Sequence, residues 1–450
     1  MLNSINPYNG QEIFKIQEWD WESVVTGLHQ ANATQKSWSG LPIKHRCSLL
    51  LILAKILRNK KEVLANTITL EVGKPITQSL AEIEKCAWLC EYYATAAEGQ
   101  LKIENVATDA KRSAIRYDPL GVILGVMPWN YPFWQVFRFA IPTLTAGNGA
   151  VLKHASNVSK SGVLIEALFH EAGYPKGIFQ FFPIRNTLVN KIIEHPIVRG
   201  VSLTGSLPAG AAVGSCAGRV IKKSVLELGG NNALVVFEDA DIRQSVVSCV
   251  HARFQNTGQS CIAGKRLLLH KAIADEFLKL LIHEVKNLKS GDPMDKNTYV
   301  GVMAREDLAK ELEQQMLSSI KKGANLLLGG KRSGAYFEPT ILSNVVPGMS
   351  VFDEETFGPL LAVSTFNSDS QAEELISNSD FGLGVSIFTR SEVRINHFIS
   401  VLNEGAIFIN DLVKSDPRLP FGGVKQSGYG RELAAAGIRE FVNIKTIYQS

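Results

Sequence analysis

SAIRYDPLGVILGVMPWN, residues 113–130, contains two runs of β-type residues joined by a turn. The runs cover residues 113–117 and 122–127, and residues 118–121, Asp-Pro-Leu-Gly, form the turn between them. Proline and glycine in this spacing favour a tight connection between extended segments. The stretch marks the point at which the pattern of the chain changes, and we therefore work outward from it.

On the N-terminal side, residues 1–100 are expected to be helical. Apolar residues recur at helical spacing in residues 49–57 and again in residues 78–98. Between these segments, Glu-Val-Gly-Lys-Pro at residues 71–75 is a helix stop.

On the C-terminal side, strand-like and helix-like runs alternate. The predicted strands are residues 149–153, 178–182, 200–203, 223–228, 233–237, 265–270, 325–328, 360–366, 384–389 and 405–410. Predicted helices cover residues 159–172, 187–194, 209–217 and 271–289. This alternation indicates crossover connections and parallel sheets. It falls into two blocks, so we expect an α/β protein with two doubly wound, Rossmann-like domains. Residues 441–448 read as one further strand without a neighbouring partner, which suggests pairing with another subunit.

Composition limits the function classes. Of the 450 residues, 45% are hydrophobic and 20% are charged, with a net charge of +4, the balance of an ordinary globular protein. The small charge argues against nucleic-acid binding and membrane-surface binding. The N-terminus has no secretory pattern, so a cytoplasmic location is expected.

The six cysteines show no paired CxxC spacing, so neither a disulfide framework nor a metal site is predicted. They are Cys47, Cys86, Cys90, Cys216, Cys249 and Cys261.

Six short motifs follow one another along the chain. They are Pro128-Trp129-Asn130, Leu203-Thr204-Gly205-Ser206, Glu227-Leu228-Gly229-Gly230, Gly258-Gln259-Ser260-Cys261, Glu354-Glu355-Thr356-Phe357-Gly358-Pro359 and Pro420-Phe421-Gly422-Gly423-Val424-Lys425. In this order and at these separations they resemble the aldehyde dehydrogenase superfamily over essentially the whole chain. The resemblance implies oxidation of an aldehyde to a carboxylic acid with a nicotinamide cofactor.

The resemblance assigns three catalytic roles. Cys261 corresponds to the family's nucleophile, and a thiolate suits covalent catalysis. Asn130 corresponds to the amide that, with the backbone N–H of the cysteine, stabilises the oxyanion. Glu227 corresponds to the base that activates water for thioester hydrolysis. The resemblance also implies that relatives which transfer the acyl group to coenzyme A lack this glutamate. Without the resemblance, these residues read as a buried core thiol, a helix N-cap and a surface carboxylate.

Cofactor binding is predicted at two places. Gly205 and Ser206 lie between a strand and a helix, where free N–H groups meet phosphate, and Trp129, Glu355 and Phe357 match the family's nicotinamide end. Lys153 ends a strand, and Ser156 stands where NAD-preferring relatives commonly carry a glutamate. A cation without that carboxylate accommodates a 2′-phosphate, so NADP is the expected cofactor and NAD the alternative.

The substrate hypothesis rests on Arg138. It corresponds to an arginine of succinate-semialdehyde dehydrogenases, where it pairs with the substrate carboxylate. A second arginine that longer members carry is Gln255 here, leaving Ser260, Gln255, Ser415 and Phe421 as further substrate-binding candidates. Ala263 stands two residues after the nucleophile, so a disulfide between near neighbours is excluded.

The favoured substrate is succinate semialdehyde, and the alternatives are another carboxylated or general aliphatic aldehyde. The rivals in other classes are an acyl-CoA-forming enzyme and an inactive structural relative.

The resemblance also implies a domain plan. Residues 1–100 and 119–230 are expected to bind the cofactor, and residues 231–428 to carry the nucleophile. Residues 101–118 and 429–450 are expected to form an oligomerisation arm, giving a homodimer or homotetramer. Neither a nucleic acid nor a membrane is expected as a partner.

Overall fold

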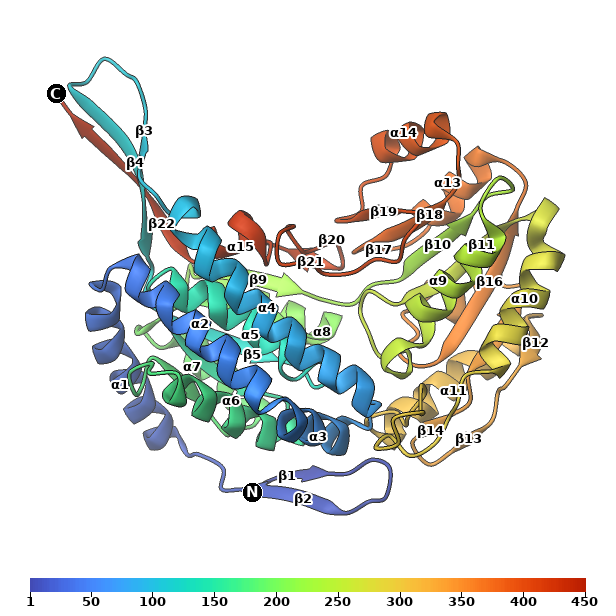
Figure 1. Ribbon diagram of the computed structural model, residues 1–450, viewed down its shortest axis with the longest axis horizontal. Coiled ribbons are helices and arrows are strands. Elements are labelled where there is room, and N and C mark those ends of the chain that lie inside the picture. The colour runs from blue at the N-terminus through green and yellow to red at the C-terminus, as the bar shows by residue number, and fades with distance from the viewer.

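A computed structural model describes all 450 residues and shows two lobes, each built around one sheet (Figure 1). The six-stranded sheet has the order β21-β9-β8-β5-β6-β7, and the seven-stranded sheet has the order β12-β15-β16-β11-β10-β18-β19. All neighbouring pairs are parallel except the edge pairs β21–β9 and β12–β15. The predicted α/β architecture with two doubly wound domains is confirmed.

The first lobe has helices on both faces of its sheet. Its strands are β5 Val122–Met127, β6 Gly149–His154, β7 Phe179–Phe181, β8 Val198–Thr204, β9 Lys223–Glu227 and β21 Gly428–Tyr429. Its helices are α1 Trp21–Ser39, α2 Ile43–Asn59, α3 Lys61–Val72, α4 Ile76–Gln100, α5 Trp134–Thr145, α6 Ser159–Glu171, α7 Val189–Glu194, α8 Leu207–Arg219 and α15 Ala434–Arg439, with 3₁₀ turns η1 Ser156–Val158 and η2 Asn186–Leu188. Separate apolar clusters fill the two faces, α2 to α6 contributing to one and α1, α7 and α8 to the other. Burial on both faces explains why these strands are continuous apolar runs.

The second lobe repeats this arrangement. Its strands are β10 Asn232–Val236, β11 Gly264–His270, β12 Asn325–Leu328, β15 Thr340–Ser343, β16 Leu360–Phe366, β18 Val385–Phe388 and β19 Ile407–Ile409. Its helices are α9 Ile242–Phe254, α10 Ala274–Lys286, α11 Glu306–Lys321, α12 Ser350–Asp353, α13 Asp369–Ser377 and α14 Glu392–Val401, with 3₁₀ turns η3 Gln255–Gly258 and η4 Lys271–Ile273. The short strands β13 Arg332–Ser333, β14 Tyr336–Phe337, β17 Phe381–Gly382 and β20 Val424–Lys425 form two small ribbons.

The C-terminal strand pairs within its own chain. β22 Val442–Gln449 runs antiparallel to β4 Arg112–Pro119, and β3 Glu104–Asn105 completes a three-stranded arm that projects from the body (Figure 1). The strand therefore has a distant partner in its own chain, and the pairing with another subunit that the sequence suggested stays a prediction. Its partner lies more than three hundred residues earlier in the sequence, so the pairing cannot be recognised from neighbouring segments.

The N-terminus also differs from the helical expectation for residues 1–100. β1 Leu2–Ile5 and β2 Glu12–Ile16 form an antiparallel hairpin before the first helix. Leu2 and Ser4 are buried and the residues that follow each are exposed, so burial in β1 alternates with a period of two. A strand of four residues is too short for this alternation to be recognised in the sequence. No helix in the structure combines the length and the apolar character needed to cross a membrane.

Candidate active site

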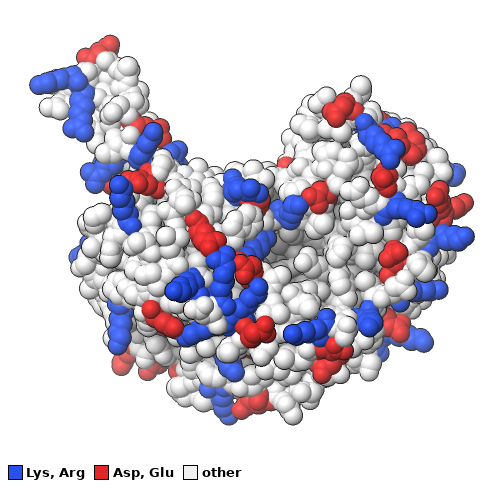
Figure 2. All heavy atoms as spheres, viewed as in Figure 1, with Lys and Arg blue, Asp and Glu red and all other residues white.

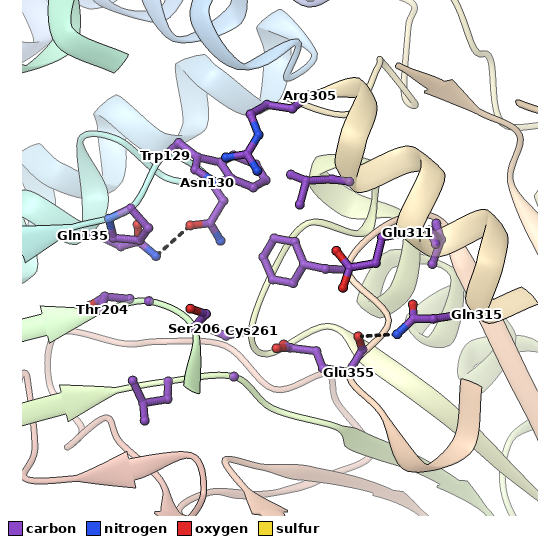
Figure 3. Close-up of a pocket in the computed structure, with 17 residues that line it drawn as sticks. Trp129, Asn130, Gln135, Thr204, Ser206, Cys261, Arg305, Glu311, Gln315 and Glu355 are labelled. Carbon is purple, nitrogen blue, oxygen red and sulfur yellow. Dashed lines mark hydrogen bonds between the residues drawn. The ribbon is translucent and has the colours of Figure 1, made fainter. Parts of the chain in front are cut away.

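A cavity of 440 Å³ lies between the two lobes. The carboxyl ends of β5, β8 and β9 form one side of it, which is where parallel sheets present ligand sites. The second lobe contributes the loop of Cys261, one face of α11 and the segment of Glu355 (Figure 3). The surface view shows charges of both signs around the hollow between the lobes (Figure 2). The lining residues are Pro128, Trp129, Asn130, Gln135, Thr204, Gly205, Ser206, Leu228, Gly229, Cys261, Arg305, Leu308, Glu311, Leu312, Gln315, Glu355 and Phe357.

Cys261 is the only one of the six cysteines that is partly exposed, and it lines this cavity. It follows the η3 turn, which ends at Gly258 with a φ of +71°. A Cβ on Gly258 would collide with the carbonyl oxygen of Gly358, so only glycine allows this close approach of two backbones. The loop geometry therefore holds the thiol at the cavity wall.

The thiol of Cys261 has a pKa raised to about 11. Burial is the main cause, and the positive charges of Arg138 and Lys265 partly oppose it. Lys265 Nζ donates to the carbonyl oxygen of Cys261 over 2.6 Å, so this cation is fixed next to the nucleophile. A thiol with this pKa is protonated at neutral pH.

Asn130 is held against the loop that carries the cysteine. Its Nδ2 donates to the carbonyl oxygen of Gln259 over 3.0 Å, and its Oδ1 accepts from Gln135 Nε2 over 3.1 Å (Figure 3). The alternative role as a helix cap fails, because α5 begins only at Trp134. Glu82 Oε1 instead accepts the N–H bonds of Phe133 and Trp134. The amide of Asn130 is thus committed to the active-site loop.

Glu227 is buried at the end of β9, which excludes the reading as a surface carboxylate. Its Oε1 has no hydrogen-bond partner. Burial raises its pKa well above the ordinary value, and the neighbouring Glu432 raises it further, while Arg138 lowers it. Leu228 and Gly229 line the cavity and Glu227 does not. Because its pKa is raised, this carboxylate is a strong proton acceptor whenever it is ionised.

Arg138 lies on α5 but does not line the cavity of Cys261. Its side chain is 3% exposed and forms an ion pair with Glu432, whose side chain is 6% exposed. The guanidinium also stands 4.4 Å from the centre of the Phe421 ring and donates to Thr204 Oγ1 over 3.4 Å. The expectation from the sequence was an arginine whose carboxylate partner is the substrate. In the structure Arg138 pairs with a carboxylate of the protein, so pairing with the substrate stays a prediction, and burial excludes a surface arginine.

Glu355 and Phe357 lie opposite the strand ends of the first lobe. Glu355 Oε1 accepts from the backbone N–H of Gly230 over 3.1 Å and lies 3.2 Å from Lys265 Nζ. The ring of Phe357 meets Trp129 edge to face, with 5.8 Å between centroids. A hydrogen bond from Gln315 Nε2 to the carbonyl oxygen of Glu355 ties this segment to α11 (Figure 3).

Three features fit a phosphate-bearing dinucleotide. Lys153 is 6% exposed at the end of β6 and has no ion-pair partner, and burial lowers its pKa to about 8. Ser156, exposed at the start of η1, places no carboxylate nearby. Ser206 precedes α8 without capping it, so the N–H groups of the first turn stay available. The backbone N–H of Gly205 is not among them, because it donates to the carbonyl oxygen of Glu227 over 3.0 Å.

Of the remaining substrate candidates, three are buried and one is exposed. Ser260 is buried. Ser415 and Phe421 are buried in the loop that passes α4 and α5. Gln255 is exposed at the start of η3 and is not brought to the other candidates through any hydrogen bond.

Sequence reasoning missed three charged residues: Lys85, Lys265 and Glu432. Lys85 Nζ donates to Ser415 Oγ over 2.7 Å. Only Lys265 had a local signal, a lysine four residues after the predicted nucleophile. The other two lie far along the chain from the residues that they contact.

Comparison with known proteins agrees with this geometry. A profile described as the aldehyde dehydrogenase family matches residues 1–447. The chain is 43% identical over 450 residues to a probable NADP(+) succinate-semialdehyde dehydrogenase of Synechocystis sp., covering 99% of each. It is 41% identical over 449 residues to an NAD(P)+ succinate semialdehyde dehydrogenase of Escherichia coli, covering 99% of this chain and 97% of that one. The crystal structure of succinic semialdehyde dehydrogenase from Streptococcus pyogenes with NADP+ matches with a TM-score of 0.97 at 33% identity, covering 100% of this chain and 99% of that one.

Proposed function

Since this chain belongs to the aldehyde dehydrogenase family, we propose that it oxidises succinate semialdehyde to succinate with NADP and with Cys261 as nucleophile. One observation carries the chemical part of the proposal. The only partly exposed cysteine lies in the wall of a cavity that Asn130 and Glu355 also line, and the buried Glu227 directly precedes Leu228 of the same wall.

Formation of the first covalent bond requires an acceptor for the thiol proton and hydrogen-bond donors for the oxyanion. The Cys261 proton must leave, and we assign its acceptance to ionised Glu227, whose raised pKa makes it a stronger base than an exposed carboxylate. Asn130 Nδ2 carries two hydrogens and gives one to Gln259, so the second is available for the oxyanion of the thiohemiacetal. The backbone N–H of Cys261 is the second donor in this proposal.

A nicotinamide cofactor held here would supply the two-electron acceptor that oxidises the thiohemiacetal on Cys261 to a thioester. We assign its nicotinamide end to Trp129, Glu355 and Phe357, and its phosphates to the first turn of α8. Lys153 and Ser156 mark the adenosine end, where an unpaired cation without a neighbouring carboxylate favours NADP over NAD.

Hydrolysis of the thioester completes the reaction. Water needs a base, and Glu227 supplies one close to Cys261. Its presence separates this chain from enzymes that transfer the acyl group to coenzyme A. The substrate carboxylate is assigned to the region of Arg138, Ser415 and Phe421, because Arg138 and Lys85 bring positive charge there.

The arm formed by β3, β4 and β22 is assigned to subunit contacts. Ile103, Val106, Ile444 and Tyr448 leave between 43% and 63% of their surface exposed on it, and apolar side chains exposed together mark interaction surfaces. A homodimer or homotetramer and a cytoplasmic location stay predictions. The two-domain division into a cofactor-binding and a nucleophile-carrying lobe is likewise proposed.

A panel of aldehydes assayed separately with NAD and NADP tests the function. The purified chain is expected to form reduced cofactor fastest with succinate semialdehyde and NADP, without added coenzyme A. A higher kcat/KM for butanal or for another ω-carboxylated aldehyde would replace the substrate assignment. Dependence on coenzyme A would overturn the hydrolytic mechanism, and absence of turnover with every aldehyde would indicate an inactive relative.

A further inference from the structure

Asn256 lies in the η3 turn, five residues before Cys261, in a backbone conformation that residues with a side chain rarely adopt. Its φ is +54° and that of Thr257 is also +54°, so two successive residues occupy the left-handed region. Asparagine tolerates this region better than most residues, but such a pair persists only where its surroundings hold it. Asn256 is 1% exposed, so those surroundings are atoms of the protein.

The side-chain amide of Asn256 joins the two loops that form the reacting centre. Its Nδ2 donates to the backbone carbonyl oxygen of Asn130 over 2.9 Å and to that of Gln259 over 3.1 Å. The Gln259 carbonyl oxygen is also the acceptor for Asn130 Nδ2, over 3.0 Å. Asn256 therefore holds the backbone of Asn130 and also binds the oxygen that holds the Asn130 side chain.

Both hydrogens of the Asn256 amide are in use, which fixes its orientation. A flipped amide would place Oδ1 against two carbonyl oxygens, neither of which has a hydrogen to donate. The buried Oδ1 has no hydrogen-bond partner, so the polar contacts of this side chain are the two bonds that it donates. The position therefore requires an NH2 group and not merely a polar side chain of this size.

The bonds of Asn256 cross from one lobe to the other. Cys261 and Asn256 belong to the second lobe, whereas Asn130 follows β5 of the first lobe. The backbone N–H of Asn256 donates over 2.6 Å to Oε1 of Gln78, which lies on α4 of the first lobe. Because the nucleophile and the oxyanion donor stand on different lobes, a small shift between the lobes misplaces the donor. A misplacement of about 1 Å can lower a rate by ~10²-fold.

We propose that Asn256 is a positioning residue that fixes the oxyanion donor Asn130 relative to the thiol of Cys261. Asn256 does not line the cavity, so it acts through Asn130 and not on the substrate. The inference rests on the proposed function for the roles of Cys261 and Asn130, and it adds the contact that holds these two residues in place across the two lobes.

Two reactions of the same thiol separate positioning from a general structural role. Attack of Cys261 on p-nitrophenyl acetate passes through a tetrahedral oxyanion, which expels p-nitrophenolate and leaves an acetyl thioester without any cofactor. Alkylation of Cys261 by iodoacetamide displaces iodide and forms no oxyanion. Asn256→Gly removes the amide and keeps the left-handed backbone accessible. In this variant the maximal rate of ester acylation is expected to fall about 10-fold or more with an unchanged KM for the ester, while alkylation stays within about twofold of the parent chain.

A double-mutant comparison tests whether the effect passes through Asn130. In an Asn130→Ala background, Asn256→Gly should slow acylation by no more than about twofold further, because the donor that it positions is gone. Asn256→Asp keeps the size of the side chain and replaces the donor by an acceptor, so it should lose as much as Asn256→Gly. Asn344→Gly is the matched control and should acylate like the parent chain. Asn344 is exposed outside the cavity, has a φ of +55°, and its Nδ2 donates to the Gly323 carbonyl oxygen over 3.0 Å.

The outcomes separate this proposal from the proposed function. Unchanged acylation in Asn256→Gly beside a loss in Asn130→Ala would overturn the proposal and leave the proposed function intact. Equal slowing of acylation and alkylation, or additive losses in the double variant, would show that Asn256 only supports the fold. If Asn130→Ala does not slow acylation, the oxyanion role of Asn130 is refuted and the positioning role with it. A parent chain whose acylation depends on both asparagines, but which does not oxidise succinate semialdehyde, would refute the substrate assignment and retain the positioning role.

Discussion

Arg138 and Glu432 form a buried ion pair that joins α5 to the segment preceding α15. Both members of the pair act on Glu227, since Glu432 raises the pKa of that carboxyl group and Arg138 lowers it. One arginine therefore influences both the predicted base and, through its charge, the Cys261 thiol.

Removal of Arg138 should act on stability before specificity. Arg138→Ala leaves Glu432 buried without a partner, so the free energy of unfolding in urea is expected to fall by ~3–5 kcal/mol. Activity should fall for succinate semialdehyde and butanal alike, and replacing both Arg138 and Glu432 by leucine should restore most of the stability. A stable Arg138→Ala variant that loses only succinate semialdehyde would instead support direct pairing of Arg138 with the substrate.

Cys261 is expected to be indispensable. Cys261→Ala should lower dehydrogenase turnover by about 10⁴-fold or more, since no other cysteine is exposed to replace the nucleophile. The thermal transition should stay close to that of the parent chain. Turnover near the parent value in a folded Cys261→Ala protein would refute the covalent mechanism.

Loss of Glu227 should separate the two halves of the reaction. In Glu227→Gln, deacylation is expected to slow by ~10²–10⁴-fold, so rapid mixing should show a burst of reduced cofactor followed by a slow steady state. Mass spectrometry should find the acyl group on Cys261. If Glu227 is also the only acceptor of the thiol proton, the burst itself should become faster with rising pH, because Cys261 must then ionise unaided. A folded variant with neither burst nor acyl-enzyme at any pH would assign Glu227 another role.

Ser156 should control the choice of cofactor. Ser156→Glu places a carboxylate next to the expected ribose, which accepts from a 2′-hydroxyl and repels a 2′-phosphate. The ratio of kcat/KM for NADP over NAD is expected to drop about tenfold or more, in line with ~1–4 kcal/mol for one close pair of charges. Ser156→Gln, which adds similar bulk without charge, is the control. An unchanged ratio in Ser156→Glu would show that this position does not face the ribose.

Lys265 should tune the nucleophile. As a cation bound to the Cys261 carbonyl it favours the thiolate, so Lys265→Met is expected to raise the thiol pKa further above about 11. At any fixed pH below that value less thiolate is present, and alkylation by iodoacetamide should slow several-fold, with its pH midpoint displaced upward. A midpoint that does not move would mean that Lys265 serves only to hold Glu355.

Local patterns in the sequence were sufficient for most of the secondary structure and for several residues that meet at one cavity. The run of residues 122–127 is apolar throughout because both faces of its sheet are covered, and β5 has the same bounds. Cys261, Asn130 and Glu355, each identified within a short motif, line a single cavity in the structure. Such motifs succeed because a turn or strand end depends mainly on its own few residues.

Only the tertiary structure decided which charges are already paired. Arg138 could be placed on a helix from its sequence, but Glu432 becomes its neighbour only when α15 packs near α5, and Lys85 meets Ser415 only across two elements. In the same way β22 finds β4. Pairings of this kind depend on how the apolar faces of distant elements pack. Because burying an unpaired charge is costly, the packed elements must also supply its partner. A local stretch of sequence contains neither the packing nor the partner.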